Sequence, residues 1–250
     1  PNLEQIVSKF LEKDPAMRYQ SMKEVLEELT RPLAVSKTEK KEKSIIVLPF
    51  ENISPDPEQE YFSDGLTEEI ITDLSQIHDI MVISRSSAMT FKGTKKKINE
   101  IAREVNVQYV LEGSVRKAGN KLRITAQLID ATTDVHLWAE KYSGTLDDVF
   151  DIQEKVSLSI VDALKLKLTP EENKKIAERP IDNIQAYECY FRARAEMLKL
   201  TEDGLKQALR DLDMGLEIVG ENVLLYYGMA EVYLQHYEYG VKADEETYTR

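Results

Sequence analysis

The run Ser44-Ile-Ile-Val-Leu-Pro-Phe50 constrains the fold of this chain more than any other stretch. It is short, apolar and rich in β-branched residues, which is typical of a strand buried on both faces. Pro49 lies near its end, where a missing N–H costs least, and Pro55 and Pro57 end the run. The run therefore predicts a strand in a covered sheet rather than one half-exposed to water.

A helix is predicted over residues 58–74, directly after this strand. One helical face is apolar, because large apolar residues recur every four positions: Phe62, Leu66, Ile70 and Leu74. The segment Ile80–Ser84 then predicts a second buried strand. A strand–helix–strand order favours a parallel pair joined by a right-handed crossover.

The next hundred residues predict more sheet and helix. A short amphipathic helix is expected near residues 98–105, followed by three strands in meander order at 108–117, 121–129 and 135–142. The middle strand alternates apolar and polar residues, which is expected when one face of a sheet is exposed to solvent. Thr145-Leu-Asp-Asp148 caps a long helix, and Pro170 suits the start of the next segment. The expected fold class is α+β or α/β with a mixed sheet.

Four stretches within this region resemble the TolB amino-terminal-like (FlgO-like) domain. They are Ile46-Val-Leu-Pro-Phe-Glu-Asn52, Tyr61-Phe-Ser-Asp-Gly-Leu-Thr-Glu-Glu-Ile70, Tyr109-Val-Leu-Glu-Gly-Ser-Val-Arg116 and Leu122-Arg-Ile-Thr-Ala-Gln-Leu-Ile-Asp130. The resemblance covers roughly residues 44–168, and we assign the domain to 44–170. It implies a non-catalytic module of the kind found fused to regulators and to tetratricopeptide (TPR) repeats.

Residues 1–29 predict two short helices separated by Lys13-Asp14-Pro15, and Ser21 with Glu24 has the spacing of a capping box. The stretch Phe10–Ser21 resembles the C-terminal end of a bacterial eukaryotic-like Ser/Thr kinase domain. In that family the arginine that matches Arg18 makes a structural ion pair with a glutamate from an earlier segment, which this sequence lacks. The resemblance implies a parent kinase that uses ATP and Mg, while this fragment lacks the catalytic motifs.

Residues 30–43 form a charged linker in which lysines alternate with Glu39 and Glu42. The linker has no apolar stripe, so a solvated tether is expected. The alternative to a plain tether is that Ser36 or Thr38 is an autophosphorylation site of a parent kinase.

Residues 184–250 predict helices only, and they resemble the start of a TPR array. Ala208 and Ala230 are 22 residues apart, which equals the 34-residue repeat period less the offset between its two small sites. The pattern departs from the family around residues 201–204 and at Gly220, which replaces the usual proline. Since the sequence stops within such a repeat and does not begin with Met, we expect a truncated array in a piece of a longer protein.

Two surfaces are candidate binding sites. On the repeat register, five residues would face the groove in which TPR proteins hold peptides: Tyr190, Arg194, Tyr227, Glu231 and Gln235. The alternative is that the aromatic members pack in the core. Lys95, Lys96 and Lys97 form a cation cluster that could hold an anion or nucleotide, with a plain solvated loop as the alternative.

Neither catalytic nor metal-binding chemistry is expected. The spacing from Gly215 to Gly220 lacks the Lys-Ser of a phosphate-binding loop. His78, His136 and His236 fall in different predicted elements, so no ligand set for a metal is expected. Cys189 falls on a packing position of its helix and is expected to be a buried thiol. No cofactor is expected within this chain.

The net charge, the lengths of the apolar runs and the cysteine count limit the kinds of partner that we expect this chain to bind. A net charge of −12 argues against general nucleic-acid binding, and no apolar run approaches the roughly 20 residues that span a bilayer. One cysteine excludes an internal disulfide and favours the cytoplasm. We therefore expect a non-catalytic regulatory portion of a Ser/Thr kinase involved in signal transduction, which binds protein or peptide partners. The alternatives are an anion-sensing module and a substrate-docking region of the kinase.

Overall fold

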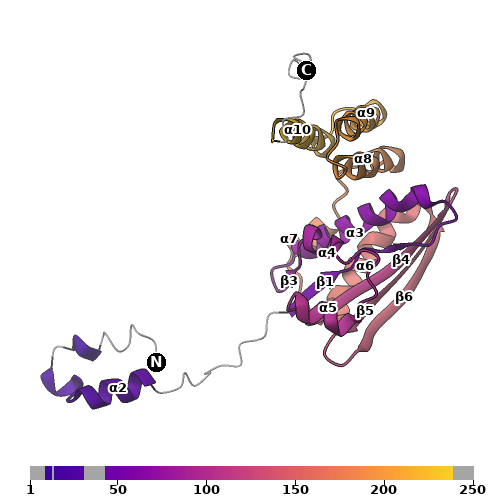
Figure 1. Ribbon diagram of the computed structural model, residues 1–250. Helices are drawn as coiled ribbons and strands as arrows, with labels where there is room; N and C mark the ends of the chain where they lie inside the picture. The colour runs from indigo at the N-terminus through magenta and orange to yellow at the C-terminus, as the bar shows by residue number, and fades with distance from the viewer. Residues whose placement is uncertain (1–8, 13, 31–42, 239–250) are drawn as a thin grey trace. The chain divides into compact units, whose positions relative to one another are not determined.

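The computed structural model describes residues 9–12, 14–30 and 43–238. The chain divides into two compact units, residues 1–42 and 43–250 (Figure 1).

The first unit contains the 3-10 helix η1 (Pro15–Met17) and helix α2 (Met22–Thr30). One half of the expected capping box is present, since the Glu24 backbone N–H donates to Ser21 Oγ at 3.3 Å. The Glu24 carboxylate accepts instead from the N–H of Gln20, one residue before Ser21, at 3.1 Å. Arg18 is exposed and its Nε donates to the Glu12 carbonyl at 2.8 Å. Much of the predicted first helix, and the linker up to residue 42, lie outside the described residues.

The second unit is built on a mixed sheet, as expected. Its strands are β1 (Lys43–Val47), β2 (Glu51–Asn52), β3 (Ile80–Val82), β4 (Tyr109–Ala118), β5 (Lys121–Asp130) and β6 (Val135–Thr145). Along the sheet the order is β3-β1-β4-β5-β6, with β2 also paired to β4. The predicted parallel crossover is confirmed because β1 is parallel to β3, and β1 is also parallel to β4. The predicted meander is confirmed by the antiparallel pairing of β4, β5 and β6.

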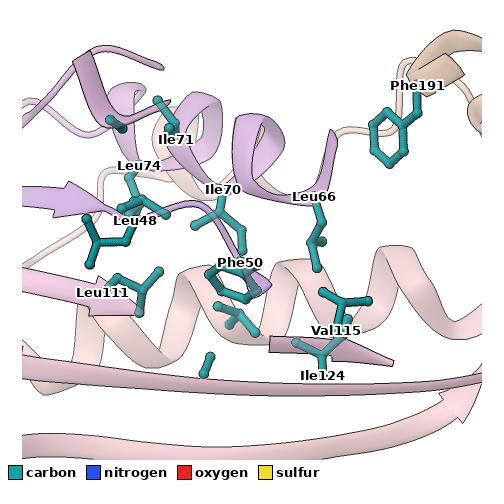
Figure 2. Packing of buried hydrophobic residues seen from close by; sticks show 14 of the residues in the cluster. Leu48, Phe50, Leu66, Ile70, Ile71, Leu74, Leu111, Val115, Ile124 and Phe191 are labelled. Atoms are coloured by element: carbon teal, nitrogen blue, oxygen red, sulfur yellow. The ribbon is translucent and has the colours of Figure 1, made fainter. Parts of the chain in front are cut away.

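Helix α3 (Glu60–Ser75), which follows the short η2 (Pro57–Gln59), packs as the four-residue spacing predicts. All four residues of its apolar stripe are at most 1% exposed: Phe62, Leu66, Ile70 and Leu74. Figure 2 shows Ile70 and Leu66 pointing from this helix toward Phe50 and Val115 on the sheet side.

The remaining helices of the sheet region are α4 (Arg85–Met89), α5 (Ile98–Glu104), α6 (Val149–Ala163, after η3 at Leu146–Asp148) and α7 (Pro170–Ile176). Helix α4 was not predicted from the sequence. Helix α3 contacts β1, β2 and β3, and α6 contacts β5 and β6. On β5 the residues that alternate inward are buried: Leu122, Ile124, Ala126 and Leu128.

Helices α8 (Ile184–Met197), α9 (Glu202–Val219) and α10 (Val223–Glu238) belong to the same compact unit as the sheet. Helix α8 packs against α9 and α3, and α10 packs mainly against α9. The helical prediction for residues 184–238 is confirmed, while residues 239–250 lie outside the described part. Together α8, α9 and α10 make up the helical hairpins.

The turn before β3 is fastened to α7 by one carboxylate. Glu172 accepts hydrogen bonds from the His78 backbone N–H at 2.9 Å and the Thr169 N–H at 2.7 Å, and it lies 2.7 Å from His78 Nδ1. The hydrogen bond with the His78 side chain, followed by those from the two backbone groups, lowers the pKa of Glu172 to about 2.

Glu172 is therefore expected to stabilise the fold above its ordinary pKa of about 4.5, and this stabilisation is lost as the pH falls toward 2. We predict that Glu172→Gln lowers stability at pH 7 and flattens the acid limb of the stability curve between pH 4.5 and 2. Urea unfolding at a series of pH values measures this. An acid limb identical to that of the wild type would contradict the role of Glu172.

Candidate functional site

A cleft of about 700 Å³ opens where β1 leaves the sheet. Its walls come from five parts of the chain: residues 48–52, the first turn of α3, the loop between α4 and α5, and strands β4 and β5. Ligands of sheets with parallel strands bind preferentially beyond the carboxyl ends of those strands, which is where this cleft lies with respect to β1. The cleft is therefore the candidate functional site.

The backbone around Phe50 gives the cleft its shape. The Leu48 N–H still donates to the Leu111 carbonyl at 2.8 Å, but the Phe50 N–H donates at 3.0 Å to the hydroxyl of Thr67 on α3. Gly113 lets the Phe50 ring lie on β4, because a Cβ at this position would be 2.6 Å from the ring and 2.4 Å from the Thr125 carbonyl. The glycine within Tyr109–Arg116 is thus a packing requirement at the floor of the cleft.

The charge of the cleft is negative. Glu51, Glu60 and Glu112 line it, and the Gln127 side-chain amide donates to the Glu112 carboxylate. Lys92 also lines the cleft, and the charge of its ammonium group is neutralised by Glu60 at 2.8 Å and Asp64 at 2.7 Å. The lining therefore offers carboxylate and amide acceptors, which suit a ligand that donates hydrogen bonds or carries positive charge.

The predicted cation cluster lies in the same loop between α4 and α5, but Lys95, Lys96 and Lys97 are not part of the lining. Lys96 pairs with Glu104 at 2.6 Å and lies 5.5 Å from the centre of the Phe91 ring. The Lys97 backbone N–H donates to Glu100 at 3.1 Å, where α5 begins. All three side chains are exposed, and anion binding there stays a prediction.

The five predicted groove residues do not share one environment. Tyr190 is 6% exposed, whereas Tyr227 is 58% exposed on α10. Arg194 joins Glu231 of α10 to Glu68 of α3, with 2.7 Å between Arg194 and Glu68. Gln235 is partly buried. Arg194 and Glu231 are in contact, as expected for neighbouring positions of a groove. However, Arg194 also contacts Glu68 of α3, and the sequence did not predict this contact. Peptide binding by these residues stays a prediction.

Helix α8 is attached to α3 and to β4, which the sequence did not predict. Lys117 at the end of β4 forms an ion pair with Glu188 of α8, and both side chains are at most 16% exposed. The Phe191 ring lies on Gly65 of α3 and meets the Phe62 ring with 5.8 Å between centroids. Helix α3 therefore borders the candidate cleft at its first turn and holds the helical hairpins along its middle.

The described residues contain neither a metal-ion cluster nor a membrane-spanning helix. Within residues 9–12, 14–30 and 43–238, no three or more His, Cys, Asp or Glu side chains are grouped as a metal site. In the same residues no helix combines the length and apolar character needed to cross a bilayer.

Solved structures similar to this chain include TolB from Acinetobacter baumannii, with 18% identity over 49% of this chain and 28% of that chain, at a TM-score of 0.36. Lipoprotein GNA1162 from Neisseria meningitidis is 18% identical over 48% of this chain and 99% of its own, at a TM-score of 0.37. The LpoB C-terminal domain from Salmonella enterica is 20% identical over 50% of this chain and 96% of its own, at 0.35. The neighbours are TolB-like and LpoB-like domains, and the likeness is one of fold alone.

A curated relative corrects one expectation. A protein of Rhizobium meliloti (strain 1021) named "Putative adenylate cyclase 3" is 47% identical over 175 residues, which cover 70% of this chain and 30% of that protein. The expectation of a non-enzymatic piece of a Ser/Thr kinase is wrong by this comparison, because the relative bears the name of a cyclase. The kinase resemblance rested on twelve residues, Phe10–Ser21, that lack every catalytic motif.

The match to a family covers more than half of the sequence. Residues 41–177 match the model of the second domain of HilA/YgeH-like transcriptional regulators. These residues include the whole sheet, the candidate cleft and helices α3 to α7. The chain therefore belongs to the family of HilA/YgeH-like regulator second domains.

Proposed function

We propose that this chain is a regulatory region of an adenylate-cyclase-type enzyme, in which the α/β domain binds a ligand in the acidic cleft and the helical hairpins respond to it. The name of the Rhizobium relative supports the class of enzyme, and the description of the matching family supports a regulatory role. The chain spans 30% of that relative, so the cyclase activity itself is part of this proposal.

The observation that carries the proposal is that α3 both lines the cleft and contacts α8. Glu60 in its first turn lines the cleft, whereas Glu68, two turns later, pairs with Arg85 at 2.9 Å and with Arg194 of α8 at 2.7 Å. A rigid helix transmits a displacement at one end to the contacts along it. Binding near Glu60 would thus bias the ion pairs that hold α8.

The chemistry of the cleft defines the class of ligand. Three glutamates and the side-chain amide of Gln127 present mostly acceptor oxygens, and the cleft lysine is already paired. A small molecule with ammonium or hydroxyl groups matches these acceptors, whereas an anion would meet the carboxylates of Glu51 and Glu112.

The helical hairpins would supply the protein contact. We assign α8 and α9 as the first helix pair of a TPR array and α10 as the start of the next. The exposed Tyr227 and the neighbouring Tyr226, at 58% and 49% exposure, give α10 an aromatic surface suited to a peptide partner.

We predict that Glu112→Gln weakens binding of a cleft ligand at least about tenfold, because a charge-assisted hydrogen bond contributes roughly 1.5–3 kcal/mol. The experiment titrates the 250-residue chain with spermidine, arginine and glucosamine and follows backbone amide shifts by NMR. We expect shifts at Gly93, Gly113 and Thr125, and smaller ones at Arg194. Asp213→Asn, an exposed carboxylate on α9, is the matched control.

Inorganic phosphate forms the second arm of this titration. Shifts confined to Lys95 and Lys97 with phosphate would favour the anion-sensing alternative and overturn the acidic cleft as the ligand site. Equal affinities for the wild type and Glu112→Gln would also overturn it.

A further inference from the structure

Helix α8 meets α3 and α6 over a buried polar cluster. Asp73 of α3 is 8% exposed, and its Oδ2 accepts hydrogen bonds from Ser157 Oγ at 2.9 Å and Gln153 Nε2 at 3.3 Å, both on α6. The Tyr187 hydroxyl of α8 donates to Gln153 Oε1 at 3.2 Å. The hydrogen bonds thus connect α3 to α8 through one glutamine of α6.

A second carboxyl group faces the same interface. Glu69 is one helical turn before Asp73, so both side chains lie on the same side of α3. Glu69 is partly buried, and it lines a small hollow together with Gln153 and Tyr187. Glu69 and Asp73 are called the carboxyl pair below.

The charged groups around the carboxyl pair do not neutralise it. Every neighbouring element adds charged or titratable groups: Glu68 of α3, Glu154 of α6, Tyr187, Tyr190 and Arg194 of α8, Glu231 of α10, and Glu178 and Arg179 after α7. Arg194 is held by Glu68 and Glu231, and Arg179 is held by Asp151. In this part of the described structure both arginines are therefore committed to other carboxylates.

We infer that the docking of α8 on α3 and α6 is a pH-sensitive switch, in which α8 is held firmly while the carboxyl pair is protonated and is released as the pair ionises. Ionising Asp73 places a charge among buried groups that supply only neutral hydrogen-bond donors. Ionising Glu69 adds a like charge one turn away. This inference rests on the α8 contacts and is independent of the ligand of the cleft.

The protonation equilibria agree with this geometry. Burial, and then the charges of Asp73 and Glu68, raise the pKa of Glu69 to about 7. Burial raises the pKa of Asp73 to about 6, against the lowering effect of the hydrogen bonds from Ser157 and Gln153. The docked state thus binds more protons than the undocked state, so docking weakens as the pH rises from about 4 to about 7.

Hydrogen–deuterium exchange of the full chain, corrected for intrinsic rates, tests the switch at pH 5.5 and pH 8. We expect the protection of α8 to fall at least about tenfold between these values, while that of β5 stays constant. In Glu69→Gln/Asp73→Asn the difference between the two pH values should disappear. Asp162→Asn, an exposed carboxyl on α6, should respond as the wild type does.

The single variants Glu69→Gln and Asp73→Asn serve if the double variant does not fold, and each should reduce the response. Protection of α8 that does not change with pH in the wild type would overturn the inference. An unchanged pH response in the double variant would overturn it equally. Neither result bears on ligand binding in the cleft, which is measured separately.

Discussion

Lys117→Met is expected to lower the free energy of unfolding by about 3–5 kcal/mol, the range for removing one partner of a buried ion pair. The Lys117 and Glu188 side chains are 10% and 16% exposed. The Lys117 ammonium also lies 3.3 Å from the Tyr61 hydroxyl and 5.2 Å from the centre of the Phe62 ring. Removing the ammonium leaves the Glu188 carboxylate without its cation in a poorly solvated place, so α8 should detach from the end of β4.

Two further variants separate this cause from a general loss of packing. Lys117→Met/Glu188→Leu should recover most of the lost stability, because an apolar pair of similar volume often replaces a buried ion pair at little cost. Lys206→Met removes the cation of an exposed pair with Glu202 on α9, and it should cost no more than about 0.5 kcal/mol. Urea unfolding measures all three. A loss below 1 kcal/mol for Lys117→Met would show that the pair is not buried in solution.

The elements that the sequence predicted well are those with a clear hydrophobic period. Helix α3 has an apolar residue at every fourth position, and β5 alternates apolar and polar residues, so local pattern alone located both. Helix α4 was missed because Arg85-Ser-Ser-Ala-Met89 is only five residues long and has no apolar period. Its start is set by a local hydrogen bond, since Ser84 Oγ accepts from the Ser87 N–H at 3.4 Å.

The cleft could not be predicted because its lining comes from five segments that only the sheet order brings together. The lysines of residues 95–97 were conspicuous as a local cluster, whereas Glu51, Glu60 and Glu112 are scattered along the sequence. The attachment of α8 is equally non-local, since Lys117 and Glu188 are 71 residues apart. One feature of the sequence does point to this attachment. Gly65 lies in the middle of α3, where glycine is unfavourable.

Gly65→Ala is expected to destabilise the chain, although the same change in the middle of a helix normally stabilises by about 0.5–1 kcal/mol. A Cβ at residue 65 would lie 2.4 Å from Cγ of Phe191. The ring cannot move aside easily, because Phe191 is 2% exposed and its centroid is 4.3 Å from that of Tyr187. Forcing an extra methyl group into a packed core costs typically about 1–3 kcal/mol, so the net effect is a loss of stability and a weaker α8 contact.

A double-mutant cycle with Phe191→Leu tests this explanation. The smaller side chain leaves room for the alanine methyl group, so Gly65→Ala should be neutral or stabilising in that background, with a coupling energy of about 1 kcal/mol or more. Gly228→Ala on α10 is the matched control, since its Cβ would come no closer than 3.0 Å to the Leu212 side chain, against 2.4 Å to the Phe191 ring at residue 65. If Gly65→Ala proved more stable than the wild type, the Phe191 ring could not lie on α3. The path from the cleft through α3 to the helical hairpins would then lose its central contact.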